Sequence, residues 1–258
     1  MHLGRVGLPK VFVIVSVIGA LLPVAAYADA PSFDRPGLGF APVTLPAGSF
    51  AWEQGLPDLQ YNNTDGVRTR FYTADTNLRL GLTGTLEVQL AGSLWNRLDV
   101  RDAGMTSHDV GAGDTRLSLK WVPALSTKTV TLAVLGGVTL DTGSAAFTNG
   151  RLIYSLGVDV AHDLGAGRSI AGYANVDHSG GSNVWTVSGN FGFPISGNIG
   201  GYVEAGRVFG GGASNTLAGG GLTWVLHERL QFDLYGRRGL TSRSPDLQAG
   251  FGISLFWK

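Results

Sequence analysis

The chain contains 258 residues, in which 19 Lys and Arg balance 19 Asp and Glu, and it has no Cys. Without Cys, disulfides cannot hold an exported chain together, and the balanced charge offers no basic stripe for nucleic acid. Charged residues make up 15% of the chain, whereas a soluble domain typically has about 25%. The composition therefore argues against a disulfide-rich domain and against a nucleic-acid-binding protein.

The N-terminus has the pattern of a secretory signal peptide. Arg5 and Lys10 are followed by an apolar run of twelve residues, which is shorter than the about 20 residues that a spanning helix needs. Small residues then provide two A-x-A cleavage motifs, which end at Ala28 and Ala30. We predict a signal peptide over residues 1–30 that is cleaved after Ala28 or Ala30. A retained membrane anchor is the alternative.

Residues 31–46 are expected to form a short periplasmic N-terminal segment, and residues 47–258 one β domain. Apolar and polar side chains alternate with a period of two in this domain, as in Leu86-Glu87-Val88. This period is typical of strands and not of helices. The alternation predicts twelve strands, at residues 48–59, 67–82, 85–98, 113–123, 129–141, 151–163, 168–178, 183–194, 198–208, 215–226, 230–239 and 246–257. Pro57 interrupts the first of them, and Pro is tolerated mainly at strand ends, edges or bulges.

The connections between the predicted strands alternate in length. Tight links such as Thr83-Gly84 follow the even-numbered strands, and longer connections follow most odd-numbered strands, the longest being residues 99–112. This asymmetry is typical of outer-membrane barrels, whose short turns are periplasmic. The last strand would pair with the first, because lipid offers no partner for an open sheet edge. We predict an all-β fold, a transmembrane antiparallel up-and-down β-barrel of about 12 strands. A soluble periplasmic β-sandwich is the alternative.

The two faces of the predicted strands differ in chemistry. The apolar face would contact lipid, and its candidates for aromatic girdles are Trp52, Tyr72, Trp121, Trp224 and Trp257. The polar face would line the lumen, and its candidate lumen-lining residues are Asp75, Arg79, Glu87, Arg97, Arg116, Lys120, Asp159, Asp177, Glu204, Asp233 and Arg237. Because an unpaired charge in a narrow interior is costly, charges of both signs are expected to pair there. They either fill the barrel by satisfying one another or contact a solute.

Motifs for catalysis or metal binding are weak. The chain has no P-loop, HExxH or EF-hand pattern, and Gln231 stands where a zincin motif starting at His227 would need its second His. Some outer-membrane lipid hydrolases place His and Ser at the outer rim, as His178-Ser179 would. Adjacent residues on a strand point to opposite faces, which argues against direct activation of this Ser. We predict neither an enzyme nor a cofactor, and a closed barrel with a lipid hydrolase or structural role is the alternative.

Three strings carry a family resemblance. They are LPAGSF at residues 45–50, GDTRLSLKW at 113–121, and the terminal hairpin at 239–252, which begins GLTSRSPD and ends AGFG. Together they resemble the outer-membrane transporter family of the meta-pathway phenol-degradation type, over nearly all of residues 45–258. The resemblance implies uptake of aromatic compounds across the outer membrane of a Gram-negative bacterium. It implies no position-specific binding residues.

Barrel size then suggests a mechanism. About eight strands leave an interior filled by side chains and about 16 to 18 leave a wide channel, so twelve predict a narrow pore with passive uptake of small solutes. Residues 99–112 are the candidate for a loop that folds inward as a constriction, with a mobile surface loop as the alternative. Little chain precedes the first strand to form a plug. The expected partners are outer-membrane lipid and lipopolysaccharide, a small-molecule solute and the barrel-assembly machinery, with no nucleic acid.

Overall fold

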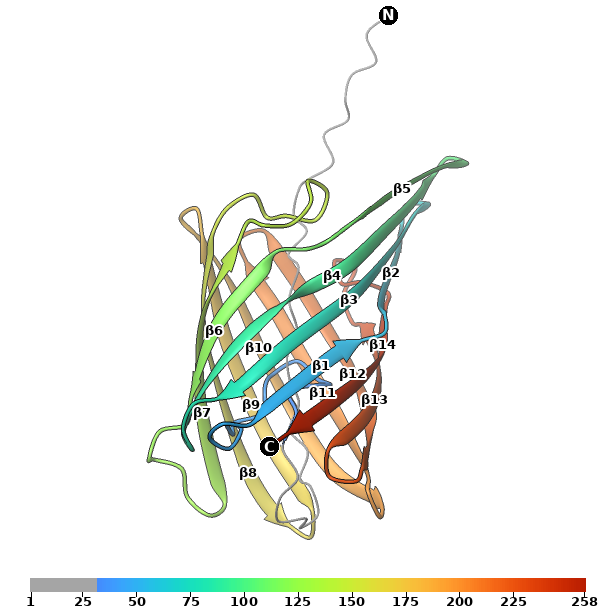
Figure 1. The fold of residues 1–258 in the computed structure, drawn as a ribbon. Coiled ribbons are helices and arrows are strands. Elements are labelled where there is room, and N and C mark those ends of the chain that lie inside the picture. The colour runs from blue at the N-terminus through green and yellow to red at the C-terminus, as the bar shows by residue number, and fades with distance from the viewer. Residues whose placement is uncertain (1–31) are drawn as a thin grey trace, which may run out of the picture.

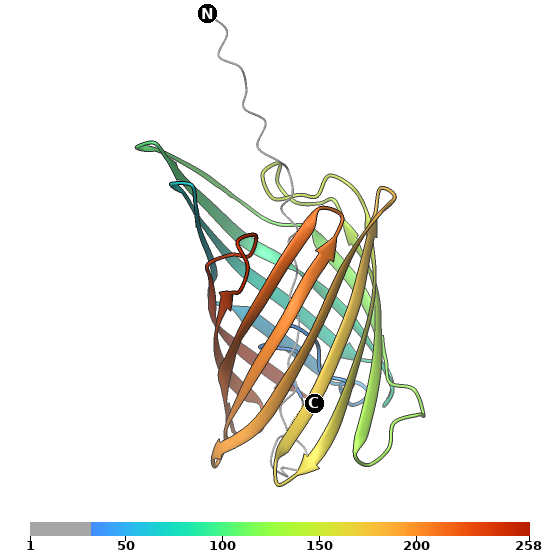
Figure 2. The same ribbon diagram turned by 180° about the vertical axis from the view of Figure 1, so that it is seen from behind.

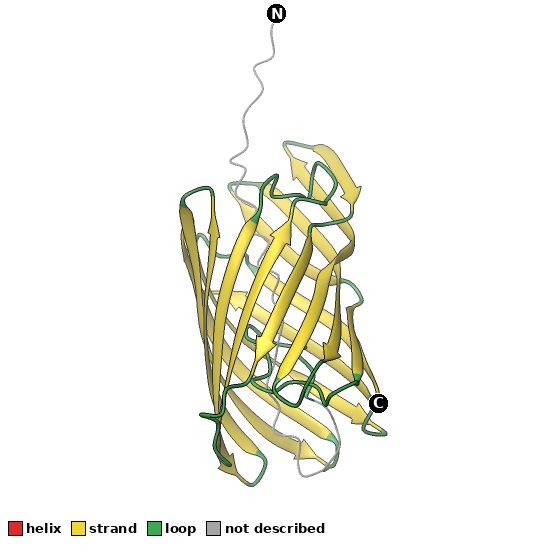
Figure 3. Cartoon of the chain, turned by 60° about the vertical axis from the view of Figure 1, so that its left-hand side comes forward, coloured by secondary structure: helices red, strands yellow, loops and turns green. Residues whose placement is uncertain are grey.

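A computed structural model describes residues 32–258, so the predicted signal peptide lies outside the described residues. Figure 3 shows strands joined by loops throughout the described chain, and in residues 32–258 no helix is long and apolar enough to cross a membrane. The strand segments are β1 (Phe50–Gly55), β2 (Asp58–Thr64), β3 (Val67–Gly81), β4 (Leu86–Asp102), β5 (Met105–Gly111), β6 (Thr115–Trp121), β7 (Val130–Leu140), β8 (Ile153–Gly165), β9 (Arg168–Ser179), β10 (Ser182–Ser196), β11 (Ile199–Gly210), β12 (Ala213–Leu226), β13 (Leu230–Gly239) and β14 (Leu247–Trp257).

These segments form a closed antiparallel barrel of twelve strands, which confirms the predicted fold. The sheet has 14 strand segments but the barrel has twelve strands, because two of the barrel strands are each interrupted once. β1 and β2 are separated by Leu56-Pro57 and both pair with β3 and β14. β5 and β6 are separated by residues 112–114 and both pair with β4. Pro57 therefore ends a strand segment, as its missing N–H requires.

The first and last strands close the barrel by pairing with each other. Phe50 lies opposite Trp257 and Gly55 lies opposite Gly252, so β1 and β14 run side by side in opposite directions (Figures 1 and 2). Every other strand is hydrogen-bonded to its neighbours in chain order. Closure leaves no open sheet edge, which is the condition for a sheet to exist in lipid.

The prediction that residues 99–112 form a loop folded into the lumen is wrong. Residues 99–112 are mostly a hairpin, in which β4 and β5 continue as paired strands and turn at Ala103-Gly104. Both turn residues have positive φ, 45° and 87°, as a two-residue hairpin of type I′ requires. β5 is almost wholly exposed and leans away from the barrel (Figure 1). Pairing between β4 and β5 satisfies the backbone N–H and C=O groups of these residues. A loop folded into the lumen would have to find other partners for them.

A different loop packs over the outer end of the lumen. Phe147, in the connection between β7 and β8, is buried and stacks on Phe71 of β3, with ring centroids 6.1 Å apart. The Asp114 carboxylate holds this loop, because it accepts hydrogen bonds from the backbone N–H groups of Gly143 and Asn149, at 2.9 and 2.8 Å. The outer mouth is therefore narrowed by residues 141–152.

A β-bulge in β4 changes which side chains point inward. Asp75 pairs with Ser93 but its neighbour Ala74 pairs with Trp95, so Leu94 is an extra residue on β4. One extra residue shifts the alternation of side chains by one position. Beyond the bulge, Asn96 is fully buried and faces the lumen, whereas Arg97 is exposed on the face of the sheet that points away from the lumen.

Glycines at the centre of β12 allow neighbouring strands to approach closely. A Cβ atom at Gly219 would overlap the backbone carbonyl oxygen of Gly236, and one at Gly220 would overlap that of Tyr202. Gly236, which lies opposite Gly220 in β13, has open space where its own Cβ would be. Positions 219 and 220 thus have no room for a side chain, because the backbone of the adjacent strands occupies that space.

We expect Gly219→Ala to destabilise the barrel and Gly236→Ala to leave its stability almost unchanged. The added methyl at position 219 must push neighbouring backbone away, at a cost of about 1–3 kcal/mol. Thermal unfolding of both variants in detergent, followed by circular dichroism, measures the difference. Equal melting temperatures for the two variants would contradict this account of the glycines.

Candidate functional site

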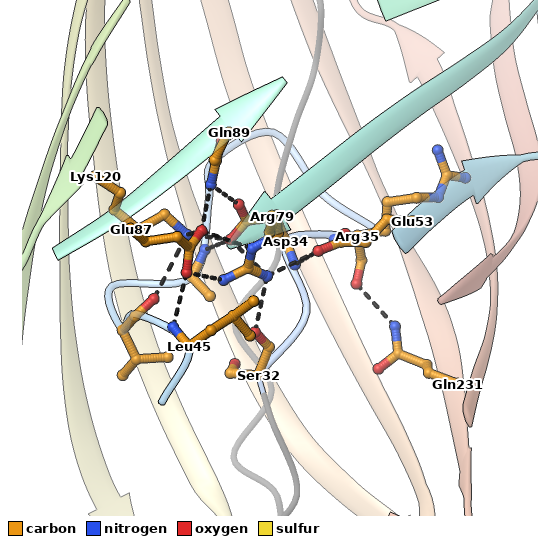
Figure 4. Close-up of polar contacts among 12 residues, drawn as sticks. Ser32, Asp34, Arg35, Leu45, Glu53, Arg79, Glu87, Gln89, Lys120 and Gln231 are labelled. Carbon is orange, nitrogen blue, oxygen red and sulfur yellow. Dashed lines mark hydrogen bonds and ion pairs between the residues drawn. The ribbon is translucent and has the colours of Figure 1, made fainter. Parts of the chain in front are cut away.

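The lumen contains a buried network of charged side chains centred on Arg79 of β3. Its guanidinium contacts the carboxylate of Glu87 on β4, with Nε to Oε1 at 2.7 Å, and that of Glu53 on β1, with Nη1 to Oε1 at 2.8 Å. All three side chains have no exposed surface. Such pairing offsets the large cost of removing charges from water. Figure 4 shows that the network joins neighbouring strands of the wall.

The chain segment before β1 lies inside the barrel and joins this network (Figure 4). Its Asp34 carboxylate accepts a hydrogen bond from Lys120 Nζ at 2.6 Å and lies 3.5 Å from Arg79 Nη1. Its Arg35 guanidinium pairs with Asp58, at 3.1 Å, and with Asp233, at 3.3 Å. Asp34 and Arg35 therefore connect opposite parts of the wall through the middle of the lumen.

The wall also binds the backbone of this segment, through acidic side chains. The Glu53 carboxylate accepts hydrogen bonds from the N–H groups of Asp34 and Arg35, at 2.9 and 2.7 Å. Leu38 N–H donates to Glu204 at 2.9 Å, and Leu45 N–H donates to Glu87 at 2.7 Å. A buried backbone segment without secondary structure must find such partners.

Apolar contacts hold the same segment against the wall. Phe33 and Leu45 pack with Ala51 and Phe256, where the barrel closes. Phe40 packs in a separate cluster and meets Tyr173 edge to face, with centroids 5.6 Å apart. We call residues 32–46 the luminal segment. This segment lies inside the barrel, whereas the sequence predicted a periplasmic segment over residues 31–46.

The structure places the predicted lumen residues as follows. Arg79, Glu87, Lys120, Asp159, Glu204, Asp233 and Arg237 are buried in the lumen, whereas Asp75, Arg116 and Asp177 face it but are less completely buried. Arg97 is the exception, because the bulge at Leu94 places it on the face that points away from the lumen. There its Nε lies 2.9 Å from Oδ1 of Asp99. The alternation alone could not reveal this shift.

Sequence reasoning did not identify Asp34, Arg35 or Asp58 as lumen residues. The only signal was that Asp34 and Arg35 are the sole charged residues in the otherwise uncharged sequence 31–52. An isolated pair of opposite charges in an apolar segment suggests burial with partners, because neither charge is needed for solubility. The partners lie up to 198 residues away along the chain.

The lumen contains a cavity beyond the luminal segment. Arg116, Tyr173, Asn175 and Asp177 line it. Asp177 accepts a hydrogen bond from the Ser155 hydroxyl at 2.5 Å. The cavity is polar and has Leu38 of the luminal segment in its lining. The lumen thus has an inner part that the luminal segment occupies and, next to it, a cavity with a charged lining.

The candidate hydrolase pair is not assembled. His178 Nδ1 lies 2.8 Å from Asn183 Oδ1, and the Ser179 hydroxyl donates to the backbone carbonyl oxygen of Leu152 at 2.8 Å. The serine is therefore held by another group and not by the histidine. A nucleophilic Ser needs a base within hydrogen-bond reach, and His178 does not occupy that position.

The outer surface has the chemistry expected of a lipid-facing wall. Trp121, Trp224 and Trp257 are exposed, while Trp52 and Tyr72 are partly covered by neighbouring side chains. Many large aliphatic side chains between them are also exposed. A polar, charged lumen inside an apolar exterior is the arrangement of outer-membrane barrels.

Replacing Arg79 by Leu should be strongly destabilising, because it leaves Glu53 and Glu87 buried without their main cation. Breaking a buried pair in this way typically costs about 3–5 kcal/mol. The matched control is Arg97→Leu, which removes an exposed ion pair worth less than about 1 kcal/mol. Chemical unfolding in detergent measures both. Similar losses in the two variants would mean that the buried network does not stabilise the barrel.

Comparisons with known proteins agree with this geometry. Residues 33–256 match the family described as "Putative MetA-pathway of phenol degradation". No curated protein sequence matches the chain. The structure is similar to that of an outer membrane channel from Pseudomonas putida F1, with a TM-score of 0.62 and 14% identity over 86% of this chain and 99% of that chain.

Two porins have related folds. The NanC porin has a TM-score of 0.54 and 9% identity over 81% of this chain and 99% of its own. The KdgM porin has a TM-score of 0.51 and 8% identity over 81% of this chain and 98% of its own. At these identities the similarity concerns the fold. The family match spans nearly the whole barrel and confirms the resemblance predicted from the sequence. This chain therefore belongs to the family of the MetA-pathway of phenol degradation.

Proposed function

We propose that this protein is an outer-membrane channel for the passive uptake of small solutes, phenol-type aromatic compounds among them. The observation that carries the proposal is a closed barrel with an apolar exterior and a lumen that contains charges of both signs. A barrel of this size leaves room for a narrow path between its side chains. Family membership and the likeness to channels and porins support the same function.

The luminal segment takes the role of constriction that the sequence assigned to residues 99–112. Around it Glu53, Arg79, Glu87 and Lys120 have no exposed surface. Solute therefore needs this segment to shift before it can cross the inner part of the lumen. The segment forms no strand or helix of its own, so its displacement breaks its contacts with wall side chains but leaves the hydrogen bonds between the strands intact.

Planar bilayers containing the purified protein should show stepwise ion conductance. Water-filled paths lined by charges conduct ions, whereas a permanently closed barrel does not. Phenol added to one chamber should reduce the current if it shares the path. Flat current at every voltage, from protein that retains its barrel by circular dichroism, would favour a closed barrel with a structural role.

A disulfide between the luminal segment and the wall tests whether the segment must move. A Cβ atom at Gly39 would lie 3.0 Å from the Cβ of Tyr173 and 2.5 Å from Oδ2 of Asp159. Since the Cβ atoms of a disulfide are about 3.5–4.5 Å apart, a small shift of the luminal segment and of the flexible Asp159 carboxylate allows the bond. The chain has no other Cys to compete. We expect oxidised Gly39→Cys/Tyr173→Cys to conduct less than the same protein after reduction. Equal conductance in both states would place the solute path beside an immobile segment.

The protein is proposed not to be an enzyme, and a lipid hydrolase assay separates the alternatives. We expect wild type, His178→Ala and Ser179→Ala to give the same background rate on phospholipid micelles, because the two side chains bind other groups. Activity in wild type that either substitution abolishes would establish the hydrolase and contradict the proposal.

A further inference from the structure

Arg116 presents free hydrogen-bond donors to the outer cavity. Its Nε donates to the Ser118 hydroxyl at 3.1 Å, but within residues 32–258 its two terminal nitrogens have neither a hydrogen bond nor an ion pair. The buried lumen cations Arg79, Lys120 and Arg237 all pair with carboxylates. Arg116 therefore differs from them, since it has the paired donors that fit a carboxylate and no protein carboxylate in contact.

Two acceptors line the same cavity. The side-chain oxygen of Asn175 is buried and has no partner in the described part of the chain. Asp177 uses one carboxylate oxygen to accept from Ser155, and its second oxygen has no hydrogen bond among the described residues. A buried acceptor without a partner is costly, so these groups suit a ligand that carries a donor.

The cavity between the cation and the acceptors also has apolar lining. Arg116 lies on β6 and Asp177 on β9, and the two strands between them, β7 and β8, both contribute residues to the cavity wall. Leu38, Ile153 and the ring of Tyr173 contribute apolar lining to the cavity. Apolar lining beside a few polar groups suits a ligand that has an apolar body and polar ends.

We propose that this cavity is a binding site for a small hydroxylated carboxylate, an aromatic hydroxy acid being the best fit. The carboxylate would bind the terminal nitrogens of Arg116, the hydroxyl would donate to Asp177 or Asn175, and the ring would contact Tyr173 and Leu38. Because Leu38 belongs to the luminal segment, the site lies at the outer end of the proposed constriction. The inference rests on the proposed channel function and names the solute class that it selects.

Calorimetry on the detergent-solubilised protein tests the site with 4-hydroxybenzoate, benzoate and phenol. Wild type should bind 4-hydroxybenzoate best. Arg116→Gln should lower the affinity for 4-hydroxybenzoate and for benzoate by about tenfold or more, the usual effect of losing a charge-assisted pair of hydrogen bonds. Arg116→Lys, which keeps the charge and loses the paired donors, should be intermediate. Arg97→Gln, on the outer surface, is the matched control and should bind as wild type does.

Asp177→Ala separates recognition of the hydroxyl from recognition of the carboxylate. It should weaken 4-hydroxybenzoate while leaving benzoate unchanged or bound more tightly, because a nearby negative charge is removed. The preference of the site for the hydroxylated acid should therefore fall. Absence of binding to wild type, or equal affinity in wild type and both Arg116 variants, would overturn the proposed site.

Conductance distinguishes failure of the site from failure of the channel. Wild type that conducts ions but does not bind 4-hydroxybenzoate would refute the site and leave the channel function intact. Protein that binds 4-hydroxybenzoate through Arg116 but never conducts would establish the site and refute the channel. If both proposals hold, 4-hydroxybenzoate should block the wild-type current at lower concentration than it blocks Arg116→Gln.

Discussion

The structure depends on one constraint, that every backbone N–H and C=O group in a bilayer needs a partner within the protein. A sheet meets this condition only when its edges pair, and β14 meets both β1 and β2 to close the ring. Closure then creates an interior with no core of its own. The inward side chains are polar, because the apolar side chains of the same strands already face lipid.

That interior has an electrostatic cost, which the luminal segment helps to offset. Glu53, Glu87 and Glu204 accept backbone N–H groups from the segment, and Asp34 lies between Arg79 and Lys120. Charges buried without partners would destabilise the barrel, so the segment and the wall stabilise each other. The same contacts that stabilise the barrel also obstruct it, which is why displacement of this segment is central to the proposed transport.

The lumen consequently has two regions with different chemistry. The luminal segment occupies the inner region, where most buried charges pair with each other or with that segment. Asp159 is the exception, since none of the ion pairs among residues 32–258 includes it. The outer region has groups without a partner among residues 32–258, above all the terminal nitrogens of Arg116 and the amide oxygen of Asn175. A solute that binds first in the outer region would lie directly against Leu38, at the end of the segment that has to move.

The sequence by itself determined the number of barrel strands and the position and two faces of most of them, because lipid on one side and polar groups on the other impose a period of two. Pro57 likewise predicted the break between β1 and β2, since its missing N–H acts locally. The sequence did not predict that β4 and β5 continue as a hairpin through residues 99–111. Only the tertiary structure decided what has no local signature. The bulge at Leu94 depends on pairing with β3 and moves Arg97 outward. The luminal segment has no periodicity, and its position follows from partners as distant in sequence as Asp233.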